Sequence, residues 1–399
     1  MVNRPSMVNR RFTALAAAAA ATTLVLVGCS SSSSSSSSSG GSSTSSTSTS
    51  STAAGSGSSL QTEAKAKAAQ YENLAKSYPG PTTPVNPGTG KAEVLSCGNT
   101  APVCEEQSAD AVSALKAMGW SVPPATDGQT SPQVESAFMY RAIQHKDSAV
   151  ILIAVNVNTI TASVQAAAAA GMTIMCTQCL SGPQWAGKVY DVTVDFHAQG
   201  EIEAWKVIAD KGDHAKVFGT TDPQFSSAAA KAQGLKDGIT ADCPTCSITI
   251  TPFPSSTAAE PGPPEFTAFL AAHPPGTVDY YVPHFDGLSV PIATTMKNAG
   301  RTDFLIGGTD GSTAGLNKLA TADPPMAFDV VEPFTYEEWC AADLIARIKA
   351  KAPLWSGYGT MPSTLLDSNN LKQFLAMYPD ESPAPAGYQA AFEKLWGKS

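Results

Sequence analysis

The stretch SAVILIAVNVNTITASVQAAAAAGMTIMC, residues 148–176, decides the fold class. It opens with an unbroken apolar run, SAVILIAV, continues with a helix-forming segment, TASVQAAAAAG, and closes with a second apolar run, MTIMC. Continuous apolar runs of this length predict strands that are buried on both faces, because an exposed face would require polar residues at alternate positions. The stretch therefore predicts a strand, a helix and a second strand within a parallel sheet that helices cover on both sides.

The same alternation of strands and helices extends in both directions. The predicted strands cover 91–98, 120–128, 148–155, 172–176, 189–196, 214–220, 247–253, 278–283, 302–308 and 326–332. The predicted helices cover 105–120, 131–146, 161–171, 201–212, 226–239, 263–273, 288–300, 311–321 and 336–350. A second set begins after residue 196 without a long linker, so the α/β pattern predicts two similar lobes with a ligand in the cleft between them.

The N-terminal residues have the pattern of an export signal. Three arginines precede an apolar run that ends immediately before Cys29, and this run is shorter than the roughly 20 residues that span a bilayer. Residues 1–28 resemble a bacterial lipoprotein signal peptide. The resemblance implies cleavage before Cys29 and acylation of that cysteine, and two or three acyl chains would hold the protein stably at the membrane.

Residues 29–89 form a predicted linker. They are rich in Ser, Thr and Gly and then in Pro, with almost no branched apolar side chains to build a core. One helix-capable segment, 60–78, interrupts the linker. We favour a loosely ordered helix there, and docking of the segment on the folded body is the alternative.

Charge and length limit the functional classes. The formal net charge is −9, and loss of the signal peptide removes three arginines and no acid, so it becomes −12. A strongly acidic protein is a poor nucleic-acid binder. Roughly 310 residues follow the linker, enough for two lobes rather than one core.

The cysteines beyond Cys29 favour local disulfides, which are the usual state outside the membrane. We expect Cys243 to pair with Cys246, and Cys97 with Cys104. Two alternatives remain open, namely four zinc thiolates from CTQC and CPTC, and a redox motif in CPTC, which resembles that of thioredoxin-like proteins. Reduced thiols are a further possibility, and the odd cysteine, Cys340, is expected to be buried and inert. The seven cysteines are Cys97, Cys104, Cys176, Cys179, Cys243, Cys246 and Cys340.

The order of elements, together with several local phrases, resembles the type I periplasmic binding-protein fold, in particular the sugar-binding lipoproteins of ABC importers. The resemblance covers about 91–351. The phrases that carry it are GWSVPPATDGQTSPQVESAFMYRAI, AAAAAGMTIM, AKAQGLKDGI, TDFLIGGTDG and the closing YQAAFEKLWG. It implies an α/β protein in which two lobes, each a parallel sheet flanked by helices, are joined by three crossings.

The resemblance also implies domain boundaries. The crossings are expected near Phe196, Glu332 and Lys351. The first lobe then comprises 90–195 with 333–351, and the second comprises 196–332 with 352–399.

Ligand-binding residues are implied at the carboxyl ends of the strands, where open α/β sheets bind ligands. The resemblance points to Asp310, Asp286 and Glu332, and to Asn156 or Asn158 after the third strand. Asp310 and Asp286 could instead cap the helices that follow them. Two positions depart from the family pattern: alanines and Lys231 replace an expected arginine, and NTAPVC replaces an expected aromatic pair.

Three aromatic residues are further candidates for stacking on a sugar face: Trp185, Phe253 and Phe285. Core packing is the alternative for each of them. Because the expected arginine is missing and three candidate groups are carboxylates, the sequence predicts a hydroxyl-rich ligand that is neutral or cationic.

The functional prediction is an extracytoplasmic substrate-binding lipoprotein of an ABC importer, with a ligand-sensing lipoprotein as the alternative. A secreted hydrolase or thiol oxidoreductase is less well supported, because the sequence contains no HExxH, G-x-S-x-G or GxxxxGK[ST] motif. We therefore expect no enzyme activity, no cofactor and no metal site. The expected partners are a sugar-like small molecule, an ABC permease and, through the lipid anchor, the cell membrane; we expect a monomer without nucleic acid.

Overall fold

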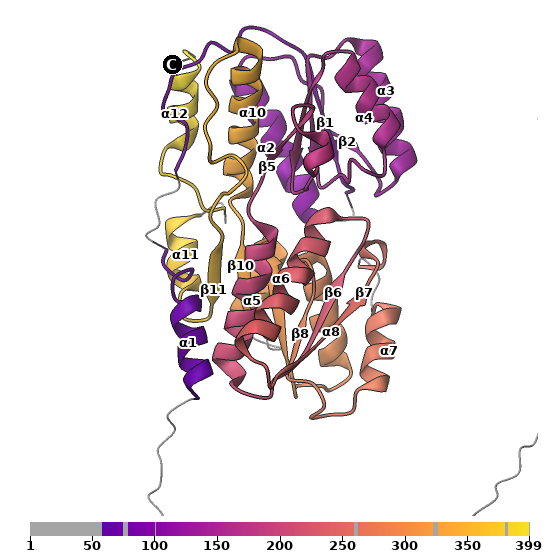
Figure 1. Cartoon of the computed structure of the whole chain (residues 1–399), viewed down its shortest axis with the longest axis vertical. Helices are drawn as coiled ribbons and strands as arrows, with labels where there is room; N and C mark the ends of the chain where they lie inside the picture. Colours follow the sequence, from indigo (N-terminus) through magenta and orange to yellow (C-terminus); the bar gives the residue numbers. More distant parts are fainter. Residues whose placement is uncertain are drawn as a thin grey trace, which may run out of the picture. The chain divides into compact units, whose positions relative to one another are not determined.

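Two β-sheets form the centres of two lobes in the computed structural model (Figure 1). The first sheet is parallel, with the order β2-β1-β3-β4-β5, and the second has the order β11-β10-β9-β8-β6-β7, in which only β11 runs antiparallel to its neighbour. The strands of the first sheet are β1 (Ala92–Ser96), β2 (Thr126–Asp127), β3 (Ala149–Ile153), β4 (Thr173–Thr177) and β5 (Val189–Val192). Those of the second are β6 (Lys216–Thr221), β7 (Ser247–Pro252), β8 (Tyr280–Val282), β9 (Leu305–Asp310), β10 (Met326–Val331) and β11 (Thr364–Asp367).

Helices follow the strands and cover the sheets. Within the described residues they are α1 (Ser59–Ala68), α2 (Pro102–Ala117), α3 (Pro132–His145), α4 (Thr161–Ala169), α5 (Phe196–Lys211), α6 (Ser226–Asp242), α7 (Pro264–Ala272), α8 (Asp286–Asn298), α9 (Thr313–Thr321), α10 (Phe334–Ala350), α11 (Leu371–Met377) and α12 (Tyr388–Leu395). Short 3-10 turns lie at Pro183–Trp185 and Ser255–Thr257. The predicted α/β class with two parallel sheets is confirmed.

The structure describes residues 58–74, 79–99, 101–258, 262–321, 326–379 and 382–398. The predicted signal peptide, Cys29 and the serine-rich part of the linker lie outside these residues. Among the described helices, none combines the length and the hydrophobicity needed to cross a membrane.

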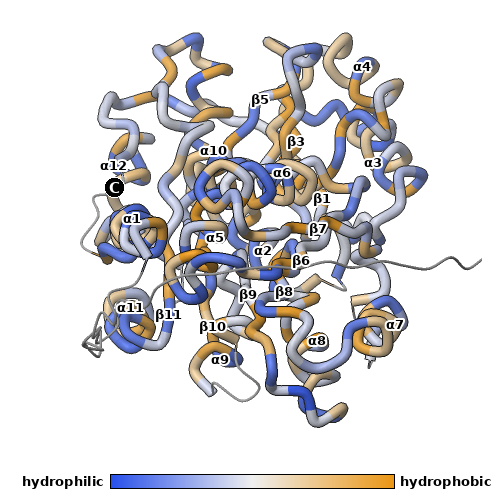
Figure 2. Tube along the Cα trace, turned by 60° about the horizontal axis from the view of Figure 1, so that its bottom comes forward, coloured by the Kyte–Doolittle hydropathy of each residue, from blue (hydrophilic) through white to orange (hydrophobic). Residues whose placement is uncertain are grey.

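Strand β3 shows why the first sheet is buried on both faces. All five of its residues are completely buried. Val150 and Leu152 pack with Phe138 and Val164 on one side, whereas Ile151 and Ile153 pack with Leu115 and Ile345 on the other. Figure 2 shows hydrophobic residues along the strands and hydrophilic residues on the outward turns of helices such as α3. The apolar run thus reflects two separate hydrophobic cores, one on each face of the sheet.

The C-terminal tail divides between the lobes. β11 pairs with β10, and α11 packs with it in the second lobe, but α12 packs against α10 in the first lobe (Figure 1). The rings of Trp339 on α10 and Trp396 stack with centroids 5.6 Å apart. The assignment of all of 352–399 to the second lobe is therefore corrected: α12 and Trp396 belong to the first lobe. The chain passes between the lobes after β5, β10 and α10, and returns to the first lobe before α12.

Helix α1 docks on the second lobe, so the favoured interpretation of a loosely ordered segment is wrong. Ala64 and Ala68 are buried against α5. The Gln61 side-chain amide donates to the carbonyl oxygen of Ala209 at 2.9 Å, and Lys67 Nζ lies 2.7 Å from a carboxylate oxygen of Asp242. The contact was hard to foresee because small alanines, rather than large apolar side chains, make the packing face.

Residues 79–87, which come later in the predicted linker, contact the first lobe. Tyr336 Oη donates to the carbonyl oxygen of Pro79 at 2.9 Å, and the guanidinium of Arg347 donates to that of Thr83 at 2.6 Å. The indole of Trp120 donates to the carbonyl oxygen of Pro87 at 3.2 Å. The predicted linker therefore contacts the second lobe first and the first lobe afterwards.

Six cysteines lie in three local pairs. The Cα–Cα distances are 5.9 Å for Cys97 and Cys104, 5.8 Å for Cys176 and Cys179, and 5.3 Å for Cys243 and Cys246, all within the range of disulfides. The CTQC and CPTC pairs belong to different lobes, which argues against a joint zinc site. Cys340 is free and buried, as expected.

Docking of α1 makes a prediction for hydrogen exchange. Ala64→Glu places a charge in the contact with α5 and should release the helix, so the amides of 59–68 should lose their protection. Ala66→Glu introduces the same side chain at an exposed position of the same helix and should leave the protection unchanged. Free exchange of these amides in the wild-type protein would contradict docking.

Candidate ligand-binding site

A cleft between the lobes lies at the carboxyl ends of the strands and the first turns of the helices that follow them. The volume of this cleft that is open to a water-sized sphere is about 70 Å³. Both lobes contribute to its walls. The lining residues are Cys97, Ala101, Val103, Cys104, Gln107, Thr130, Ala154, Gln178, Phe225, Ser227, Ala228, Lys231, Ser255, His284, Phe285, Asp310 and Phe334.

Lys231 is the central charge of the second-lobe wall. Its Nζ lies 3.0 Å from Asp310 Oδ1 and 3.8 Å from Glu332 Oε1, and its side chain is almost completely buried. Burial alone would lower the pKa of Lys231, but these two carboxylates raise it above its ordinary value, so the amine stays protonated. Close contact between α5 and α6 places it: a Cβ on Gly200 would overlap the carbonyl oxygen of Lys231.

Asp310 ends β9 in a left-handed conformation, with φ at 109°. A side chain rarely adopts this conformation, and such strain is concentrated at functional sites. Burial raises the pKa of Asp310 above its ordinary value, against the lowering effect of the Lys231 ammonium, and the ion pair at 3.0 Å stabilises the charged carboxylate. Asp310 therefore presents an acceptor to the cleft from a fixed backbone.

Asp286 lies behind Asp310 and supports the turn after β9. Its Oδ1 accepts from the backbone N–H of Thr309 at 3.2 Å, and its Oδ2 accepts from both the N–H and the hydroxyl of Ser312 at 2.9 Å. Burial and the neighbouring Asp310 raise its pKa to about 7. It does not line the cleft.

Glu332 is buried below Lys231 and is linked to the first lobe. The side-chain amide of Gln178 donates to both Glu332 and Glu337, the latter at 3.0 Å. Burial raises the pKa of Glu332 to about 7, against the opposing effect of Lys231. This hydrogen-bonded bridge joins β4 to the segment that crosses between the lobes after β10.

The chain matches a known family, described as "Periplasmic binding protein domain", over residues 94–352. It belongs to this family. No curated protein sequence matches the chain. The resemblance to the type I periplasmic binding-protein fold is thereby confirmed, and the matched structures are solute-binding proteins rather than enzymes.

Solved structures with the same fold include three whose bound molecules are named. An ABC transporter solute-binding protein from Agrobacterium vitis with bound allitol is 18% identical, with a TM-score of 0.65, and the match covers 72% of this chain and 99% of that one. The Caulobacter myo-inositol-binding protein is 18% identical (TM-score 0.63, 71% and 95% covered). A solute-binding protein from Actinobacillus succinogenes with bound D-allose is 15% identical (TM-score 0.61, 71% and 100% covered).

The other predicted site residues differ in whether they line the cleft. Asn156 lies in a smaller pocket that adjoins the cleft, and the side-chain oxygen of Asn158 accepts from the indole N–H of Trp185 at 2.8 Å. Trp185 and Phe253 are buried in the cores of the two lobes and do not line the cleft. Phe285 does line the cleft.

Several of the lining residues were not among the predicted site residues. Phe225 and Phe334 lie at the N-termini of α6 and α10, just as Phe285 lies at the N-terminus of α8. This recurrence was a usable signal, because the helix N-termini that follow parallel strands face the ligand. His284 contacts the hydroxyls of Thr220 and Ser255, and burial lowers its pKa to about 3, so it is neutral.

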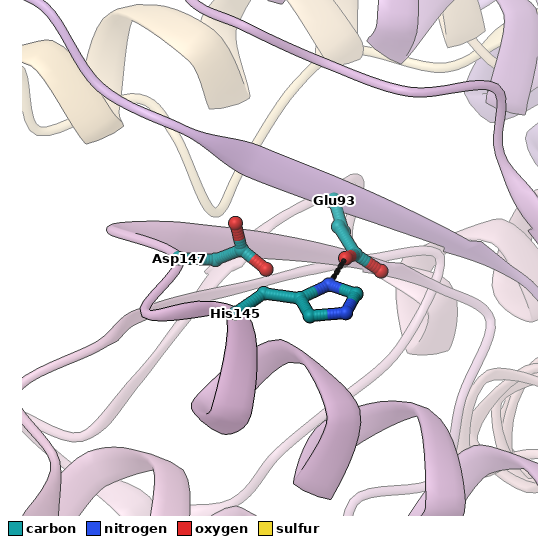
Figure 3. Close-up of side chains that lie close together, drawn as sticks. All are labelled: Glu93, His145 and Asp147. Atoms are coloured by element: carbon teal, nitrogen blue, oxygen red, sulfur yellow. Dashed lines mark hydrogen bonds and ion pairs between the residues drawn. The ribbon is translucent and has the colours of Figure 1, made fainter.

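A second cluster lies at the amino-terminal ends of β1 and β3 in the first sheet, away from the cleft. Figure 3 shows Glu93, His145 and Asp147 close together, the group of described residues whose ligand atoms are near enough to hold a metal ion. The two oxygens of Glu93 are already occupied, one by His145 Nδ1 at 2.7 Å and the other by the Arg141 guanidinium at 2.8 Å. The adjacent Arg141 disfavours a further cation, so these side chains form an ion-pair network.

The raised pKa of the buried acid Glu203 can be tested through the pH dependence of stability. It is buried on α5, and its pKa is raised to about 8 by burial, opposed by Lys231 and reinforced by Asp310 and Glu332. The folded protein therefore keeps a proton that the unfolded chain releases above about pH 4.5. The bound proton favours the folded state, and this contribution to the free energy of unfolding is lost as the pH rises through 8.

The Glu203→Gln variant keeps the shape of the neutral acid. We expect it to melt a few degrees above the wild-type protein at pH 8.5 and at nearly the same temperature at pH 5. Glu201→Gln, on the same helix with a side chain that is 36% exposed, is the control. An equal difference in melting temperature at both pH values would show that Glu203 is not protonated in the folded state.

Proposed function

We propose that the protein is an extracytoplasmic substrate-binding lipoprotein of an ABC importer, and that it binds a neutral sugar or polyol in the cleft between its lobes. The observation that carries this proposal is the charge balance of the cleft. Among its lining residues, Lys231 and Asp310 are the charged pair, and they neutralise each other at 3.0 Å. His284 adds no charge, because burial lowers its pKa to about 3.

This balance disfavours both kinds of charged ligand. An anion would have to compete with Asp310 and Glu332 for Lys231, and a cation would have to compete with Lys231 for Asp310. A neutral hydroxyl can donate to Asp310 or accept from Lys231 while the ion pair stays intact. The structure therefore supports the neutral ligand and gives no support to the cationic one.

The remaining wall suits the mixed surface of a sugar. Phe225, Phe285 and Phe334 offer aromatic surface to C–H groups, and Gln178, Ser227 and Ser255 offer donors and acceptors. The neutral molecules named in the structures of related fold, allitol, myo-inositol and D-allose, have this combination of apolar and hydroxyl-rich faces.

Membrane attachment is the second part of the proposal. Cys29 follows an apolar run with arginines before it, and a Ser-rich segment separates it from the folded residues. Acylated there, the protein would stay at the outer face of the cell membrane beside a permease, with a reach set by the tether. We propose that it acts as a monomer.

The function predicts a specific effect of Asp310→Asn. Asparagine tolerates the positive φ but removes the charge, so the affinity for the solute should fall at least about tenfold, near 1.4 kcal/mol. Mass spectrometry of the purified protein under native conditions would identify the co-purified solute, and calorimetry would measure its affinity. Stability of the unliganded protein should also fall, since Lys231 loses its nearest partner.

Asp367→Asn is the matched control for this experiment. Asp367 pairs with Lys206 at 3.1 Å in the second lobe, outside the cleft. The control should lower stability and leave affinity unchanged. Equal affinities for Asp310→Asn and the wild-type protein would remove Asp310 from the site, and a bound anion would contradict the proposed ligand class.

The anchor has its own test. Cys29→Ser removes the acylated thiol, so in a bacterial host the protein should move from the membrane fraction to the soluble fraction or the medium. Retention of the variant in washed membranes would contradict lipid anchoring at this cysteine.

A further inference from the structure

Gln107 is an unusual residue of the cleft wall. It lies in the second turn of α2, lines the cleft and is only 1% exposed. Neither its side-chain oxygen nor its side-chain nitrogen has a hydrogen-bond partner among the described residues. Buried amides are nearly always paired, because an unpaired one loses its hydrogen bonds to water without replacement.

The position of Gln107 is held firmly. Cys104 lies one helical turn before it and is at disulfide distance from Cys97 at the end of β1. The carbonyl oxygen of Cys104 accepts from the hydroxyls of Ser108 at 2.5 Å and Ser96 at 3.3 Å. The helix that carries Gln107 is therefore held in place, whereas the side-chain amide has no partner among the described residues. An unpaired group that a fixed helix places at a cleft is preorganised for a ligand.

A comparison with Gln199 shows that burial alone does not produce this arrangement. Gln199 is equally buried, but its amide donates to the hydroxyl of Ser363 at 3.1 Å, and it does not line the cleft. In Gln107, by contrast, neither the carbonyl oxygen nor the NH₂ group of the side chain has a partner among the described residues, and the residue lines the cleft.

We propose that Gln107 is a specificity-determining ligand contact, and that it binds two adjacent hydroxyl groups of the solute. Its carbonyl oxygen accepts from one hydroxyl while its NH₂ group donates to the other, a pairing that a carboxylate cannot make because it only accepts. Asp310, from the other lobe, supplies an acceptor for a further hydroxyl. This inference rests on the proposed function and extends it to a solute with a vicinal diol.

The chemistry predicts strong discrimination. A site built to hydrogen-bond hydroxyls rejects an analogue that lacks them, because its own buried groups then stay unpaired. The cost of burying the free amide is already present without ligand, so it is relieved on binding.

The test compares Gln107→Met with the wild-type protein. Methionine has a similar volume and no hydrogen-bonding amide, so the unliganded variant should melt at the same temperature or higher. With myo-inositol, allitol, D-allose and D-fucose as probes, calorimetry should show binding of at least one by the wild-type protein and at least tenfold weaker binding of that probe by the variant. Gln133→Met, at an exposed position of α3 in the same lobe, should change neither property.

Each outcome separates the two proposals. Equal affinities of Gln107→Met and the wild-type protein would overturn the role of Gln107 and leave the proposed function standing. A clear fall in the melting temperature of unliganded Gln107→Met would assign the amide to the fold and overturn the inference. No binding of any probe by the wild-type protein at millimolar concentrations would overturn the neutral-polyol function and this inference with it.

Discussion

The ion pair between Lys231 and Asp310 is the interaction on which the rest of the site depends. Lys231 is the cation that faces Asp310, Glu332 and Glu203, all of them buried. Without it Asp310 and Glu332 would have to take up protons or leave the interior, as Glu203 already keeps its proton, because an unpaired buried charge is strongly destabilising. The lysine thus allows one carboxylate to remain charged at the cleft, while burial raises the pKa of Glu332 and Glu203 towards neutrality.

This charge network also connects the site to the chain crossings. Gln178 in the first lobe donates to Glu332, which ends the strand that leads into the second crossing, and to Glu337 in the first turn of α10. Gln178, which lines the cleft, is therefore bonded to the segment that crosses between the lobes after β10.

The described residues between 58 and 89 pack on both lobes. The described chain begins at Ser58 and packs on α5 before it contacts α10 and α12. The predicted linker ran to residue 89, whereas the described residues from Ser58 onwards already pack on the lobes.

The sequence by itself determined the α/β class and the two lobes, because buried parallel strands leave long apolar runs. It placed the candidate site at the carboxyl ends of the strands, where open α/β sheets bind ligands. The resemblance to the family, rather than the strand pattern, pointed to Asp310. Only the tertiary structure decided that Lys231 would neutralise Asp310, that α12 would join the first lobe and that Gln107 would lack partners. These features depend on contacts between residues far apart in the chain, and local periodicity carries no record of which distant side chains meet.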